Sequence, residues 1–198
     1  MNQHVRVSAI LAMLFPYVDV DKDILEAKAK IGTNVHNAIL QDCRDDFVVL
    51  ECDRARAYFN SYKMMYPKIP PIKQIQRLYC DKLMITGECD GLLQGNGPDM
   101  LIDWKCSASP HIQQWKMQAH FYWYLLKENG YSISERMMWI NLRHHKRIKY
   151  KPGGYNELIY DPVEPIVFNF TFEQEVLDKC IEAAIRYWDL KSDAKCLA

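Results

Sequence analysis

The sequence lacks any excess of charge, so its composition does not identify a polyanion-binding protein. Its 198 residues include 25 Lys+Arg and 25 Asp+Glu, and the formal net charge is zero. Any nucleic-acid-binding surface must therefore be a local patch. Hydrophobic residues make up 49% of the chain and charged residues 25%, which is typical of a globular protein with a substantial core.

Long apolar stretches are also missing near the start of the chain. The apolar run at 9–15 is followed by the acidic segment 19–23, and it is too short to span a membrane. No small-residue cleavage site follows it. We therefore expect a cytoplasmic protein, in the host cytoplasm if the source is viral, with no membrane partner.

Close cysteine pairs are absent as well. The chain has seven cysteines, an odd number, and no two of them have Cys-x-x-Cys spacing. This pattern favours reduced and mostly buried thiols over a disulfide framework.

The order of apolar patterns and chain breakers predicts an α/β fold with a small mixed central sheet flanked by helices. Neither an internal repeat nor a low-complexity segment interrupts it. We expect helices at 8–15, 21–43, 47–66, 110–128 and 172–190, and strands at 74–80, 83–93, 99–105, 136–142 and 165–170. The length predicts one domain over 1–198, with a helical part at 1–66 and a core at 72–190.

Two carboxylates and a lysine are predicted to converge on the central strands. Asp103 and Lys105 are two apart, which places both side chains on one face of a strand. The turn at 95–98 (Gly-Asn-Gly-Pro) suits a hairpin, which would bring Asp90 close to Asp103. Such a group favours a hard divalent cation with a lysine beside it. The alternatives are a turn-capping Asp90 and a plain ion pair between Asp103 and Lys105.

These residues form an ordered series of motifs. The series is Gly32-Thr33-x-x-His36, Gly87-x-x-Asp90, Asp103-x-Lys105 and Gln118-x-x-x-Tyr122. It resembles the PD-(D/E)XK nuclease superfamily, in particular its RecB-like and phage exonuclease branch, over about residues 8–126. The resemblance implies a restriction-endonuclease-like core and a Mg²⁺- or Mn²⁺-dependent deoxyribonuclease. The expected enzyme is an exonuclease of viral or bacterial type that hydrolyses phosphodiester bonds in DNA recombination, repair or replication.

The resemblance also implies roles for individual residues. Catalytic roles would fall to Asp90, Asp103, Lys105, Gln118 and Tyr122, and metal-binding roles to His36, Asp90, Asp103 and the backbone carbonyl of Trp104. Lys105 would orient the attacking water and stabilise the charge on the phosphate. By itself, His36 could equally be an ordinary helix-surface histidine, and Tyr122 a core residue of an amphipathic helix.

The chain departs from its relatives at one place. Relatives often carry a glutamate where this sequence has Gln76. A single metal ion could therefore suffice, or Glu51 could replace the missing glutamate. Some relatives bind an iron–sulfur cluster on clustered C-terminal cysteines. This chain has only Cys180 and Cys196 there, so we expect no cluster.

A basic stretch at 136–151 is the candidate DNA surface. It contains no Asp or Glu, and its proposed DNA-binding residues are Arg143, Lys146, Arg147, Lys149 and Lys151. Tyr150 and Tyr155 could stack on bases. The alternative is a solvated hairpin.

Expected partners are single- or double-stranded DNA and a possible second copy or recombination or replication protein. A non-catalytic accessory protein that retains the fold is the second functional hypothesis.

Overall fold

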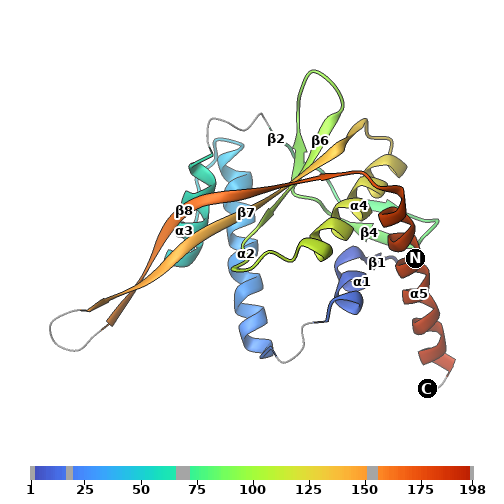
Figure 1. Ribbon diagram of the computed structural model, residues 1–198, viewed down its shortest axis with the longest axis horizontal. Coiled ribbons are helices and arrows are strands. Elements are labelled where there is room, and N and C mark those ends of the chain that lie inside the picture. Colours follow the sequence, from blue (N-terminus) through green and yellow to red (C-terminus); the bar gives the residue numbers. More distant parts are fainter. Residues whose placement is uncertain (1–2, 17–19, 66–71, 151–155, 197–198) are drawn as a thin grey trace.

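The protein is a mixed α/β structure with two mixed sheets flanked by helices (Figure 1). A computed structural model describes residues 3–16, 20–65, 72–150 and 156–196, with side chains up to residue 193. The helices are α1 (Val7–Leu14), α2 (Lys22–Asp42), α3 (Asp53–Lys63), α4 (Ile112–Glu128) and α5 (Gln174–Cys196). The strands are β1 (Val5–Arg6), β2 (Ile72–Lys73), β3 (Leu78–Cys80), β4 (Ile85–Gly87), β5 (Gly91–Leu93), β6 (Asp99–Lys105), β7 (Ile133–Tyr150) and β8 (Asn156–Thr171).

The larger sheet has the strand order β2-β5-β6-β7-β8. β5 and β6 form an antiparallel hairpin in which Gly91 lies opposite Ile102. β6 and β7 are parallel and are connected through α4, and β8 returns antiparallel to β7. In the smaller sheet, β4 lies between β1, which is parallel to it, and β3, which is antiparallel.

Strand β6 separates two hydrophobic clusters because its side chains alternate between the two faces of the sheet. Leu101 belongs to the cluster that contains residues of α1, α4 and α5. Ile102 and Trp104 belong to the cluster with α2 and α3, where the Trp104 ring meets Tyr62 edge-on with centroids 5.2 Å apart. Figure 1 shows α2 and α3 at one side of the molecule and α1, α4 and α5 at the other. No helix in the described ranges is long and apolar enough to cross a membrane.

The predicted helix at 110–128 is confirmed, with its start at Ile112. Gly130 follows its C-terminus with φ of 79° and donates a hydrogen bond to the Lys127 carbonyl, as its place after the helix predicts. The predicted start of the third helix at residue 47 is wrong, because α3 begins at Asp53. Val48 and Leu50 instead pack from an irregular segment against the second cluster.

The prediction of a single strand at 83–93 is also wrong. The segment contains two short strands, β4 and β5, and they belong to different sheets. The break between them covers residues 88–90. Asp90 therefore lies immediately before β5 and not inside a continuous strand.

The largest difference concerns the basic stretch. The predicted strands at 136–142 and 165–170 are the inner parts of a long ribbon formed by β7 and β8, which pair as far as Tyr150 opposite Asn156. Figure 1 shows this ribbon projecting from the body beyond α3. The outer half of β7 is dominated by charged side chains and β8 contains Pro162 and Pro165, and both features argue against a strand in a sequence.

Candidate active site

Asp90 is fixed to the edge of β6 by its own side chain. Its Oδ2 accepts a hydrogen bond of 2.7 Å from the backbone N–H of Trp104. The next residue, Gly91, must be small, because a Cβ atom there would lie 2.5 Å from Ile72 Cγ2 and 3.1 Å from the Lys73 carbonyl oxygen. The tight pairing of β5 with its neighbours therefore sets the place of the carboxylate.

Asp103 and Lys105 project together from β6. Lys105 Nζ donates to Asp103 Oδ1 at 2.6 Å and Oδ2 at 3.0 Å. The Asp103 side chain is 4% exposed and that of Lys105 18%. The predicted strand spacing thus produces a nearly buried ion pair, which is one of the alternatives that the sequence left open.

His36 reaches the same place from α2. Its Nδ1 lies 2.9 Å from Asp90 Oδ1, and its side chain retains 29% exposure. On the same helix, Asn34 ties α2 to the segment before α3: its Oδ1 accepts from the Glu51 N–H at 3.0 Å and its Nδ2 donates to the Val49 carbonyl at 3.2 Å. Asn34 lies inside the Gly32-to-His36 motif, but only its contacts in the fold show its role.

The charges of these groups are strongly interdependent. Burial and the neighbouring Asp90 charge raise the pKa of Asp103 to about 7, against the opposing effects of Lys105 and His36. Burial would also raise the pKa of Asp90, but His36 and Lys105 lower it below its ordinary value. Burial would lower the pKa of His36, but the negative charge of Asp90 raises it above its ordinary value. Of the two carboxyls, Asp103 is the one that binds a proton more readily, because burial and the nearby charge of Asp90 disfavour its ionised form.

Gln118 and Tyr122 face each other one turn apart on α4. Gln118 Nε2 lies 3.0 Å from the Tyr122 hydroxyl oxygen, to which it donates. The Tyr122 ring is buried against Gly87, where a Cβ atom would lie 2.8 Å from Tyr122 Cε1. Burial and the charge of Asp103 raise the pKa of Tyr122, so its hydroxyl stays protonated. Tyr122 is thus both a core residue and a neighbour of the acidic group.

The donor atoms suit a divalent cation in kind. Carboxylate oxygens are the usual ligands of Mg²⁺, and an imidazole nitrogen is compatible with Mn²⁺. As arranged here, however, no three His, Cys, Asp or Glu side chains in the described part of the chain are placed so that they could hold a metal ion. Lys105 occupies both oxygens of Asp103 and the Trp104 N–H occupies one of Asp90. A cation would have to replace some of these hydrogen bonds, and the ligand role of the Trp104 carbonyl stays a prediction.

The other residues to which the resemblance drew attention have different environments. Glu51 forms an ion pair of 3.3 Å with Lys30 and is half exposed. Gln76 is exposed between β2 and β3. Cys180 is buried under α4, where its thiol donates to the Met117 carbonyl, and the side chain of Cys196 lies outside the described residues.

The predicted DNA-binding residues lie along the outer half of β7. Arg143, Lys146, Arg147 and Lys149 are described, whereas Lys151 and Tyr155 lie outside the described residues. The opposite strand carries Glu157, Asp161 and Glu164, and Arg147 makes a two-point ion pair with Asp161. The positive stretch is therefore partly neutralised by its own hairpin, a pairing that the sequence of β7 alone does not reveal.

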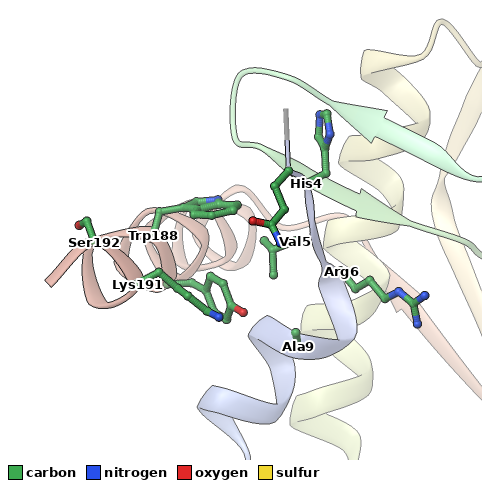
Figure 2. Close-up of a pocket in the computed structure, with 9 residues that line it drawn as sticks. His4, Val5, Arg6, Ala9, Trp188, Lys191 and Ser192 are labelled. Carbon is green, nitrogen blue, oxygen red and sulfur yellow. The ribbon is translucent and has the colours of Figure 1, made fainter. Parts of the chain in front are cut away.

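The described chain also contains a pocket of about 350 Å³ between the N-terminal strand and α5. Figure 2 shows Trp188 and Lys191 of α5 on one side of it and Val5 and Ala9 on the other. Its lining includes none of the motif residues and no carboxylate, so we place the candidate chemistry at Asp90 and Asp103 instead.

Comparisons with known proteins do not assign the chain to a family. No family model matches the chain, and no curated protein matches it. A solved structure described as "Crystal structure of SSO0001" aligns with 91% of this chain and 84% of its own, at 11% sequence identity and a TM-score of 0.33. Similarity at this level carries no functional argument.

Proposed function

We propose that this protein is a divalent-metal-dependent DNA nuclease with a restriction-endonuclease-like core, of the PD-(D/E)XK type. The observation that supports this most strongly is the convergence of two carboxylates, a lysine and a histidine from α2, the end of the β4–β5 break and β6. Electrostatic arrangements of this kind, with strongly shifted pKa values, are concentrated at functional sites.

In this proposal, Asp90, Asp103 and His36 would hold Mg²⁺ or Mn²⁺. The bound cation would polarise the phosphate and lower the pKa of a water molecule. The raised pKa of Asp103 fits this role, because the repulsion between two carboxylates is the cost that a cation removes.

Lys105 provides a positive charge beside the two carboxylates. Its ammonium group is held beside Asp103 and is only 18% exposed, so its direction is restricted before substrate arrives. From there it would donate to the attacking water and to a phosphate oxygen whose negative charge grows during hydrolysis. The Tyr122 ring packs α4 against Gly87 of β4, and Gln118 of the same helix donates to the Tyr122 hydroxyl.

Exonuclease activity, and a role in DNA recombination, repair or replication, are proposed on the sequence resemblance alone. One observation favours a second candidate, a non-catalytic nucleic-acid-binding protein: the described side chains do not form a ready-made metal group. The two candidates differ in whether a divalent cation produces cleavage.

The deciding experiment is incubation of end-labelled linear DNA and of circular DNA with the protein and Mg²⁺ or Mn²⁺. We expect the linear DNA to be degraded, the reaction to stop with a chelator, and Asp103→Asn to abolish it while circular dichroism stays unchanged. Resistance of the circular DNA would support an exonuclease. Binding without cleavage under any of these metals would favour the non-catalytic candidate.

A further inference from the structure

Arg54 lies near the end of β6 although no motif includes it: its partner His144 is three residues beyond Asn141, which pairs with Lys105. Arg54 is the second residue of α3, and the segment just before α3 is tied to α2 through Asn34, two residues before His36. Arg54 contacts Tyr58, so it lies on the side of the sheet that carries Ile102 and Trp104.

Two aromatic side chains set the direction of the Arg54 guanidinium. Its Nε donates to Nε2 of His144 at 3.2 Å, and its Cζ lies 5.9 Å from the centroid of the Tyr58 ring. The rings of Tyr58 and His144 meet edge-on with centroids 4.6 Å apart, and Tyr58 is 2% exposed. Because Nε2 accepts, His144 is neutral and carries its proton on Nδ1. Burial and Arg54 also lower the pKa of His144, which favours this neutral form.

The guanidinium is held by uncharged side chains in this arrangement. Among the described residues, no carboxylate lies within ion-pair distance of Arg54, whereas Arg56, two residues further along α3, pairs with Asp53 at 3.3 Å. An oriented guanidinium held by neutral groups retains N–H donors with the geometry that matches two phosphate oxygens.

The end of β6 lies close to this guanidinium. Cys106, which directly follows Lys105, packs in the same cluster as Tyr58. Lys105 itself pairs with Asn141, three residues before His144 on β7. Arg54 is thus held near the end of the strand that carries the candidate catalytic lysine.

We propose that Arg54 binds a backbone phosphate of the nucleic-acid strand in this site, and that His144 is the residue that positions it. The proposal rests on the proposed nuclease function and adds a substrate contact to it. Since His144 lies at the root of the β7–β8 ribbon, the same pair ties the ribbon to the start of α3.

The test compares Arg54→Met, Arg54→Lys and the matched control Arg56→Met. Methionine keeps an apolar stem against Tyr58 but removes every donor, and lysine keeps the charge without the planar fork. Binding of a labelled DNA oligonucleotide, single-stranded and duplex, is measured across a salt titration with Ca²⁺ in place of Mg²⁺. Cleavage is measured with Mg²⁺, and melting temperature without metal.

We expect Arg54→Met to weaken binding and to reduce the log–log salt slope by about one, because one phosphate contact is lost. Arg54→Lys should restore the slope but not the cleavage rate, and Arg56→Met should match the wild type. If Arg54→Met lowers the melting temperature but leaves the salt slope unchanged, Arg54 has only a structural role and the inference is wrong. The nuclease proposal would still hold in that case, provided that the wild-type protein cleaves DNA. A wild type that neither binds nor cleaves DNA would overturn both.

Discussion

Lys105 bonds both carboxylate oxygens of Asp103, at 2.6 and 3.0 Å, from a position two residues along the same strand. Neighbouring side chains on one face of a strand stand side by side, so this chelating contact requires the ammonium to bend back over Asp103. The contact both stabilises a carboxylate that is only 4% exposed and occupies the atoms that a metal ion would use.

Replacing Lys105 by methionine should therefore affect catalysis and stability in different ways. We expect DNA cleavage to fall by at least about 100-fold, the usual cost of removing one preorganised donor. The melting temperature of the metal-free variant should fall more at pH 8 than at pH 6, because at lower pH Asp103 can take up a proton. Lys82→Met is the control, since Lys82 pairs with Glu128 while remaining 73% exposed. Equal losses in the two variants would contradict the assignment.

The raised pKa of Asp103 makes a prediction for stability against pH. A carboxyl whose pKa rises from 3.8 to about 7 on folding favours the folded state below pH 4, and this contribution is lost as pH rises towards 7. The Asp103→Asn variant carries no such charge. As pH rises from 4 to 8, the free energy of unfolding of the metal-free variant should therefore increase by at least about 1 kcal/mol relative to that of the wild type. Denaturant unfolding at several pH values measures it.

The control for this experiment is Asp161→Asn. Its hydrogen bond with Arg147 lowers the pKa of Asp161, so any contribution is lost as pH falls and not as it rises. A pH profile for Asp103→Asn parallel to that of the wild type would show that Asp103 is ionised at the ordinary pH.

His36→Ala separates a metal ligand from a structural partner of Asp90. If His36 is a ligand, calorimetry should detect weaker Mn²⁺ binding with little change in the melting temperature of the metal-free protein. If His36 only supports Asp90, loss of the 2.9 Å contact between them should lower the melting temperature instead. Unchanged Mn²⁺ affinity with a lower melting temperature would assign His36 a purely structural role.

Gly87→Ala tests the packing behind the site. The added Cβ would lie 2.8 Å from Tyr122 Cε1 and 2.9 Å from Leu125 Cδ1, so α4 or β4 must shift. We expect a loss of about 1–3 kcal/mol in the free energy of unfolding, typical of overpacking. Gly95→Ala, where nothing lies within 4 Å of the added atom, should be near neutral. Denaturant unfolding of the two variants gives the comparison.

The ribbon's charges can be tested in the same way as Arg54. We expect Lys146→Ala combined with Lys149→Ala to reduce the salt slope of DNA binding by up to ~2. Arg147→Ala should have a smaller effect, because Asp161 already neutralises its guanidinium. Salt titrations with Ca²⁺ provide the slopes. An unchanged slope in the double variant would place the DNA surface elsewhere.

The sequence predicted the parts of this protein that depend on local pattern. The two-residue spacing of Asp103 and Lys105, the turn at 95–98 and the helix ending before Gly130 each follow from short-range geometry, and each has the expected place in the fold. Arg54 could not be found in this way, because its partner His144 is 90 residues away and neither belongs to a motif. The acidic residues opposite the basic stretch were missed because their pairing depends on the register of a ribbon.

That ribbon has a consequence for the rate at which its backbone amides exchange with solvent. β6 ends at Lys105, opposite Asn141 of β7. Just beyond this point, the Ser61 hydroxyl of α3 holds both ribbon strands, because it accepts from the Arg143 N–H of β7 and donates to the Val163 carbonyl of β8. Beyond this tie, β7 pairs with β8 alone, so alternate N–H groups on each strand point away from the ladder. Hydrogen exchange should therefore divide β7 sharply at Arg143, with slow amides before it and fast ones towards Tyr150.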